Sequence, residues 1–382
     1  MIPRIQSRLP EVGTSIFAVM TAMADEHGAL NLSQGFPDFH PPPELIELVH
    51  RHLQAGNNQY APMPGVPALR QEIANKTGAP GGFTPDSDTE ITVTAGATEA
   101  LFVAITAVVH PGDEVILFDP AYDSYVPTIR LCGGHPVRLQ LRPPLWSIDW
   151  DEVADRLTDR TRLVIINTPH NPTGSILCRE DWSTLARLLH NTDILVLSDE
   201  VYEHIIFDGQ DHAGALCHPE IAERAFAVSS FGKTYHATGW KVGYCIAPEP
   251  LMQEFRRVHQ YVTYCVNTPV QHALAEYLSF SEHYQQLPSF YQHKRDLFCS
   301  QLEHSRFRFT PTAGSYFQLL DYSDITGQSD LEYARRLVRE AGIASIPVSF
   351  FYEDAPDQRL LRFCFAKDDA TLKTGAEILC QI

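Results

Sequence analysis

Lys233 lies in the segment FGKTYHATGWKVG, directly after the apolar run AFAVSS, which has the pattern of a buried strand. The letters GKT resemble the end of a phosphate-binding P-loop, which needs a glycine five positions before the glycine of GKT. Ala227 stands at that position, so a P-loop ATPase is disfavoured. A lysine amine can instead form a Schiff base with an aldehyde or ketone, which splits one difficult step into easier ones. For any single lysine, a solvated surface charge is the competing interpretation.

Polar and aromatic side chains follow other apolar runs. Asp199 ends DILVLSD, where a carboxylate faces the edge at which α/β proteins bind ligands and could hold a protonated ring nitrogen. Tyr202, in SDEVYE, and Asn171, in NTPHNPTG, could both bond an oxygen of such a ring. Tyr122, in FDPAYDSY, could stack on a planar cofactor. The competing interpretations are a capping role for the aspartate and simple packing for the tyrosines.

Another segment could bind an anion. The strand-like ITVT runs into GAT and an apolar helix, and free N–H groups at a helix start face anions. Gly96, Ala97 and Thr98 would supply these groups, although an ordinary strand-to-helix turn has the same appearance. Ser230 and Lys241 lie on either side of the lysine of GKT and could add a hydroxyl and a charge.

Arg362 lies between apolar residues in RLLRFCFA, and a buried guanidinium needs an anion because an unpaired buried charge is unstable. A substrate carboxylate, held by two parallel hydrogen bonds, would satisfy it. An internal salt bridge to an Asp or Glu is an equally good interpretation from the residue alone. A lysine, a carboxylate for the ring nitrogen and an anion pocket are the set that pyridoxal phosphate (PLP) requires.

The elements that must position these residues alternate from residue 90 onwards. Apolar strands such as EVILF, RLVIINT and DILVLSD are separated by helices, which predicts a mainly parallel sheet covered on both faces. Helices over 268–304 and 329–341, with strands at RFRFT, SYFQLL and RLLRFCFA, predict a smaller α+β domain. We expect residues 41–275 to form the large PLP-binding domain and 276–382 the small one, which residues 1–40 join.

Composition narrows the function classes. A formal charge of −18 over 382 residues disfavours general nucleic-acid binding, and no apolar run is long enough to span a bilayer. The start, MIPRIQSRLPEVG, lacks the apolar stretch of a secretory signal, and the eight cysteines are scattered without a CxxC pair. We therefore expect free thiols and a cytoplasmic location. The 17 histidines show no ligand spacing, so no metal is predicted.

Taken together, the motifs resemble class I/II aminotransferases of PLP fold type I. They occur in the family's order over about residues 30–370: SQGFPDF, NQYAPMPG, TAGATEAL, FDPAYDSY, NTPHNPTG, SDEVYE, SSFGKTYHATGWKVGY and LRFCFAK. The segments FGKTYHATGWKVGY and NTPHNPTG carry a narrower likeness to bacterial methionine aminotransferases and the kynurenine/glutamine aminotransferase branch.

The resemblance implies roles for individual residues. Lys233 would be the Schiff-base lysine that also moves the proton, Asp199 would pair with the pyridinium nitrogen, and Tyr202 and Asn171 would bind the ring oxygen while Tyr122 stacks on the ring. The phosphate would lie on Gly96, Ala97, Thr98, Ser230 and Lys241, with Tyr60 reaching it from the second subunit of a homodimer. Arg362, Asn171 and the Gly35 backbone would bind the substrate α-carboxylate, with Phe17 near the substrate. The family often has Arg where Lys241 stands.

The implied activity is a ping-pong transfer of an amino group from an L-amino acid to a 2-oxo acid. An apolar or aromatic donor is favoured, methionine first, because the motifs show no second arginine for a distal carboxylate. A kynurenine/glutamine-type aminotransferase and a cysteine-S-conjugate β-lyase are alternatives on the same residues. A ligand-binding regulator that keeps the fold without turnover is disfavoured, because the catalytic set is complete.

Overall fold

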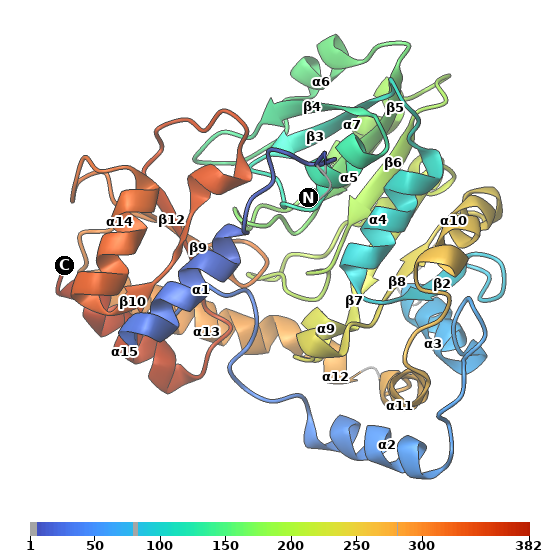
Figure 1. Cartoon of the computed structure of the whole chain (residues 1–382), viewed down its shortest axis with the longest axis horizontal. Helices are drawn as coiled ribbons and strands as arrows, with labels where there is room; N and C mark the ends of the chain where they lie inside the picture. The colour runs from blue at the N-terminus through green and yellow to red at the C-terminus, as the bar shows by residue number, and fades with distance from the viewer. Residues whose placement is uncertain (1–5, 79–82, 281) are drawn as a thin grey trace, which may run out of the picture.

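A computed structural model describes residues 6–78, 83–280 and 282–382, so the first five residues of the predicted N-terminal segment lie outside it. Figure 1 shows a sheet with helices on both sides, and a second group of elements from the C-terminal part of the chain, drawn in orange and red. Helix α1 (Ile16–His27) lies against this C-terminal group, whereas α2 (Pro43–Gln54) lies at the far end of the molecule (Figure 1).

Seven strands form the large sheet, and the mainly parallel arrangement predicted from the sequence is confirmed. Strands β3 to β7 pair in parallel, while β8 runs antiparallel to both of its neighbours. Their order across the sheet is β2 (Ile91–Thr94), β8 (Gly243–Ile246), β7 (Ala225–Ser230), β6 (Leu195–Asp199), β5 (Thr161–Asn167), β3 (Glu114–Asp119) and β4 (His135–Gln140).

Successive residues of each strand face opposite sides of the sheet, so the apolar runs supply two cores. On one side Val115 and Leu117 pack with α4 (Ala97–Val108), α5 (Tyr125–Leu131) and α10 (Glu249–Val262). On the other side Ile116 and Phe118 pack with α6 (Trp150–Arg156), α7 (Arg179–Leu188) and α8 (Pro219–Ala222). A third cluster joins β2 and β8 to α2, α3 (Pro67–Gly78) and α11 (Thr268–Leu278).

The C-terminal group is built on a small antiparallel sheet in the order β11 (Ile346–Pro347), β12 (Leu360–Cys364) and β9 (Phe317–Asp321). Its core also contains side chains of α1, and β1 (Leu30–Asn31) pairs in parallel with β10 (Ile343–Ala344). The helices of this group are α12 (Glu282–Gln285), α13 (Leu287–Leu302), α14 (Asp330–Arg336), which continues as a π-turn over Leu337–Ala341, and α15 (Asp369–Cys380). The domain boundaries stay a prediction.

One local prediction is wrong. The run RFRFT forms no strand, because Arg308 pairs with Asp321 at a single bridge at the end of β9. The helices expected over 268–304 are present as α11, α12 and α13. Pro288 lies in the first turn of α13, where a proline starts a helix but cannot continue one from the preceding turn.

Across the described ranges, no helix has both the length and the apolar character that crossing a bilayer requires.

Candidate active site

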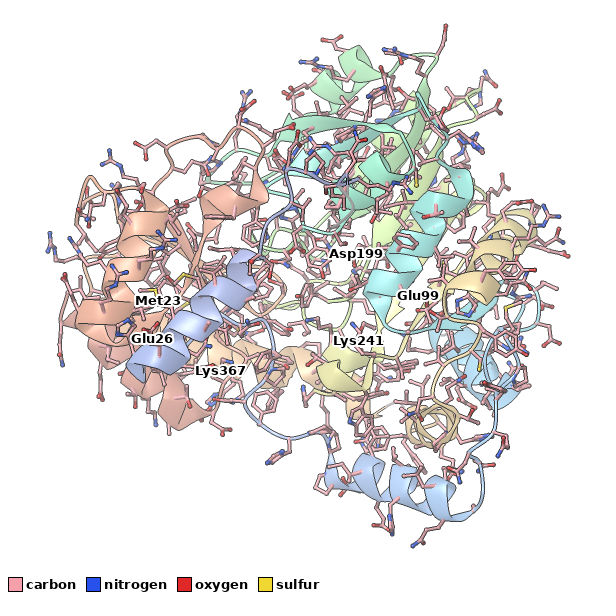
Figure 2. All side chains as sticks on the ribbon, in the orientation of Figure 1. Met23, Glu26, Glu99, Asp199, Lys241 and Lys367 are labelled. Carbon is pink, nitrogen blue, oxygen red and sulfur yellow. The ribbon has the colours of Figure 1, made fainter. Side chains whose placement is uncertain are left out.

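A cavity of about 300 Å³ lies at the carboxyl ends of the parallel strands, between the large sheet and the C-terminal group. It is lined by every predicted site residue except Tyr60: Phe17, Gly35, Gly96, Ala97, Thr98, Tyr122, Asn171, Asp199, Tyr202, Ser230, Lys233, Lys241 and Arg362. Figure 2 places Asp199 and Lys241 in this central region, beside α4. The fold thus brings together residues from segments more than 300 positions apart.

Lys233 lies on α9 (Phe231–Thr234), a single turn that begins directly after β7. Its Nζ atom donates hydrogen bonds to the Gly35 carbonyl at 3.1 Å and to the Tyr316 hydroxyl at 2.8 Å. Burial lowers the pKa of the Lys233 amine to about 8, and the positive charges of Arg362 and Lys241 act in the same direction. Much of the amine is therefore neutral near pH 8, as a nucleophile or base must be.

Asp199, the last residue of β6, is 3% exposed. Its Oδ2 accepts a hydrogen bond of 2.6 Å from Tyr125, and its Oδ1 accepts only a long one, 3.4 Å, from the Val201 backbone. Burial raises the pKa of Asp199 to about 6, although the Tyr125 bond opposes the shift. A buried carboxylate held in this way would be stabilised by a cation such as a protonated ring nitrogen.

The residues predicted around the ring lie on the loops after β3, β5 and β6. Asn171 is fixed by its backbone N–H, which donates to Asn167 at 2.8 Å. Tyr202 is buried, and its ring meets the Tyr316 ring edge-on at 5.0 Å. Burial raises the pKa values of Tyr202 and Tyr122, so both hydroxyls stay protonated and can donate hydrogen bonds.

The predicted anion site is shaped by glycine and by the start of α4. Gly96 caps α4 with φ 79°, and a Cβ atom there would come within 3.2 Å of the Lys241 Nζ. Lys241 itself has a left-handed backbone, φ 54°. The first N–H groups of a helix have no partners within the helix. Together these features form a cationic cradle: the Lys241 amine lies beside the start of α4, in space that a side chain at position 96 would otherwise occupy.

Arg362 lies in the middle of β12 and is only 1% exposed. Its Nη1 donates to Asn171 Oδ1 at 2.9 Å and its Nη2 to the Ser33 carbonyl at 3.0 Å, while its buried Nε has no partner. No acidic side chain of the described chain forms an ion pair with it, so the salt-bridge interpretation is not supported. Burial lowers the pKa of Arg362 to about 10. The guanidinium is thus available for an external carboxylate.

Phe17 lies over this guanidinium, with 5.2 Å between its ring and the Arg362 Cζ atom. Tyr60 is 84% exposed and lies outside the cavity of its own chain. Sequence reasoning missed Tyr125 and Tyr316, which contact Asp199 and Lys233, and the cavity-lining residues Asp123 and Phe317. Tyr125 stands three positions after Tyr122 in FDPAYDSY, a one-turn spacing that could have revealed it. Tyr316, in the apolar run SYFQLL, gives no such signal.

The residues present fit PLP. One cavity holds a partly neutral amine for an aldehyde, a buried carboxylate for a ring nitrogen and a cationic cradle for a phosphate. Arg362 lines the same cavity and forms no ion pair with the described residues, so its guanidinium adds a place for a substrate carboxylate.

Comparison with known proteins agrees with this interpretation of the site. Residues 28–379 match the family described as aminotransferase class I and II. A methionine aminotransferase of Escherichia coli is 54% identical over 99% of this chain and 98% of its own length. Human kynurenine–oxoglutarate transaminase 1 is 34% identical over 99% of this chain and 98% of its own length. A solved Escherichia coli structure, described as having a methionine aminotransferase function, has a TM-score of 0.98, with 54% identity and full coverage of both chains.

Proposed function

The chain belongs to the class I and II aminotransferases, and we propose that it transfers the amino group of an apolar or aromatic L-amino acid, preferably methionine, to a 2-oxo acid. The predicted family, its fold type I architecture and its PLP dependence are confirmed. The substrate preference is the proposed part. It is supported by the relative named for methionine, which is similar over nearly the whole chain.

The observation that carries this proposal is the presence of Lys233, Asp199 and the unpaired Arg362 on one cavity. Arg362 is the only arginine among the described residues that line it. A dicarboxylic substrate would need a second cation for its distal group, whereas Asp123 lies on the cavity wall and would repel that group. The aromatic ring of Phe17 offers an apolar contact instead.

When bound, PLP supplies an electron sink for the pair left behind when the substrate Cα–H bond breaks. We assign Asp199 Oδ1 to the ring nitrogen, because Tyr125 already occupies Oδ2. Arg362 orients the α-carboxylate, with Asn171 held beside it. Lys233, once its amine is free, takes the α-proton at Nζ. The cradle at Gly96 and Lys241 would hold the phosphate, together with Ala97, Thr98 and Ser230.

We also propose a cytoplasmic homodimer in which Tyr60 reaches the cavity of the second subunit. Tyr60 packs edge-on against Tyr264 with 5.7 Å between ring centroids, and both rings are substantially exposed. Tyr261 and Val262 are exposed on the same part of the chain. A second copy would cover these apolar side chains. Native mass measurement of wild-type protein and of Tyr261→Asp tests the dimer, and a wild-type monomer would exclude it.

A panel of amino donors tested against several oxo acids decides the substrate class. The spectral change between the two cofactor forms reports each half-reaction. We expect methionine and aromatic donors to react faster than glutamate or aspartate. Faster reaction of kynurenine or glutamine would favour the kynurenine/glutamine-type alternative. Release of pyruvate and ammonia from a cysteine conjugate, in excess of amino transfer, would identify a β-lyase.

A further inference from the structure

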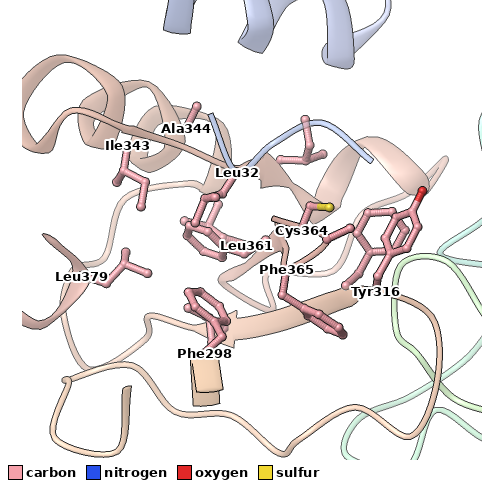
Figure 3. Packing of buried hydrophobic residues seen from close by; sticks show 14 of the residues in the cluster. Leu32, Phe298, Tyr316, Ile343, Ala344, Leu361, Cys364, Phe365 and Leu379 are labelled. Atoms are coloured by element: carbon pink, nitrogen blue, oxygen red, sulfur yellow. The ribbon is translucent and has the colours of Figure 1, made fainter. Parts of the chain in front are cut away.

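Tyr316 is a fully buried tyrosine, 0% exposed, that stands just before β9. Its ring lies at the edge of the apolar cluster of the C-terminal group, with Cys364 and Phe365 nearby, and its hydroxyl points away from that cluster (Figure 3). The hydroxyl oxygen is 2.8 Å from Lys233 Nζ and 2.5 Å from the Gly35 carbonyl oxygen. The hydroxyl of a residue that precedes the small sheet thus contacts the amine of Lys233, on the helical turn that follows the large sheet.

We propose that the Tyr316 hydroxyl positions the free amine of Lys233 so that its lone pair faces the cavity. This role rests on the proposed function, in which Lys233 is released and acts as a base. Tyr316 would be a positioning residue, acting through the lysine.

The donors and acceptors can be assigned without ambiguity. A carbonyl oxygen only accepts hydrogen bonds, so Tyr316 must donate its single proton to Gly35. Its oxygen is then free to accept a bond from Lys233, whose second N–H goes to the same carbonyl. A neutral amine has two N–H bonds and one lone pair. Since both N–H bonds are occupied, the lone pair points away from the two acceptors, on the side where Lys233 lines the cavity.

This orientation matters for the proton transfer. The α-proton of the substrate moves to the Nζ lone pair, and the electron pair of the broken C–H bond stays with the substrate. The resulting ammonium has three N–H bonds, two of which remain with Gly35 and Tyr316. The third faces the cavity and carries the transferred proton, which can be returned from the same position.

The surroundings hold this hydroxyl in place. The Tyr316 ring is packed by Tyr202 at 5.0 Å, Phe317 at 4.9 Å and Tyr291 at 5.8 Å between centroids. A Cβ atom on Gly35 would approach the Phe317 ring to 2.8 Å, so a larger residue at position 35 would have to displace that ring. Burial also raises the pKa of Tyr316, which keeps the donated proton on its oxygen.

Tyr316→Phe tests the proposal, with Tyr291→Phe as its matched control. Tyr291 is also fully buried in the same cluster, but its hydroxyl contacts His236 Nδ1 at 3.0 Å and does not contact Lys233. In the holoenzyme we expect Tyr316→Phe to lower kcat about tenfold to hundredfold with little change in KM, since misplacing a reacting group has effects of this size. Tyr291→Phe should leave both close to wild type.

A second measurement uses cofactor-free protein and the pH dependence of the rate at which it captures PLP. Capture needs the neutral amine, so the rate rises with pH through the pKa of Lys233. Tyr316→Phe removes a hydrogen-bond acceptor that stabilises the ammonium form of Lys233. We therefore expect the midpoint of the rate profile to move to lower pH, while Tyr291→Phe leaves it unchanged. If Tyr316→Phe does not fold, difluorotyrosine at position 316 keeps the ring and weakens the acceptor, and should give a smaller shift in the same direction.

An unchanged midpoint and kcat, matching Tyr291→Phe, would overturn the role of Tyr316 while leaving the aminotransferase assignment intact. Failure of wild-type protein to transfer amino groups would instead overturn the proposed function.

Discussion

The two walls of the cavity are built in different ways. On the large sheet, Asp199 and Lys233 lie at or just beyond strand ends, where the backbone turns and side chains face the ligand edge. On the small sheet, Arg362 stands in the middle of a strand, with Leu361 and Phe363 buried beside it. The first wall carries the groups that we propose for the cofactor, whereas the second carries the guanidinium that we propose for the substrate carboxylate. The difference teaches that a site group can come from a strand end, which parallel topology brings to the ligand edge, or from a charge buried within a strand.

Lys233→Ala should have the largest effect, because it removes the group that links both walls. We expect a fall in kcat of about 10⁴-fold or more, on the scale seen when a catalytic nucleophile is lost. Steady-state transaminase assays measure it, and bound cofactor should still be detectable by absorbance through the phosphate cradle. Full activity in this variant would remove the mechanism.

Arg362→Ala should weaken substrate binding and leave cofactor binding intact. Removing a partner of a buried charge-assisted pair lowers binding by about 2–5 kcal/mol, so kcat/KM for the amino donor should fall at least about 30-fold. Cofactor affinity, titrated by absorbance, should stay near wild type. Equal losses of cofactor and substrate binding would show that the two walls do not bind their ligands independently.

Asp199→Asn should stabilise the cofactor-free protein against unfolding and abolish amino-group transfer by the holoenzyme. The pKa of Asp199 is about 6 when folded, above its ordinary value of 3.8, so its ionisation destabilises the fold as pH rises through this window. The free energy of unfolding of the asparagine variant should therefore exceed that of wild type by about 2–3 kcal/mol at pH 7.5, and should equal it at a pH below about 3.8. Urea unfolding at the two pH values measures the difference.

Asp119→Asn is the matched control for that experiment. Asp119 ends β3, is also buried, and forms an ion pair of 2.6 Å with Arg138. Burial raises the pKa of Asp119 as well, but its removal leaves the Arg138 guanidinium without its carboxylate partner, so this variant should be destabilised at pH 7.5. A gain in stability for both variants would show that burial alone, and not the lack of a cation, accounts for the result at Asp199.

Asp123→Asn should have the smallest effect and sharpens the account of selectivity. Removing this negative charge from the cavity wall should raise kcat/KM for glutamate relative to methionine about two- to fivefold, a size typical of solvent-screened charges. The gain should shrink as ionic strength rises. A constant ratio of the two substrates would exclude an electrostatic role for Asp123.

The sequence predicts the large-sheet wall better than the small-sheet wall. Asp199, Asn171 and Gly96 follow apolar strands in short polar motifs, and parallel topology brings such positions to one edge. Arg362 is recognisable because a charge interrupts an apolar run. Tyr316 could not be found, since its partners Lys233 and Gly35 are 83 and 281 positions away and nothing local marks its hydroxyl. RFRFT alternates like a strand, but its pairing depends on tertiary contacts that no local pattern contains.

The contact between the Ser33 carbonyl and Arg362 joins residues 329 positions apart. During synthesis, residues 30–36 leave the ribosome long before β10 and β12, which they must join. The large sheet can form its strand order while the last part of the chain is still being translated, because β2 to β8 are all complete by residue 246. A nascent chain that ends before Arg362 can therefore contain the strands that carry Asp199 and precede Lys233, but the contact between Arg362 and the Ser33 carbonyl cannot yet form.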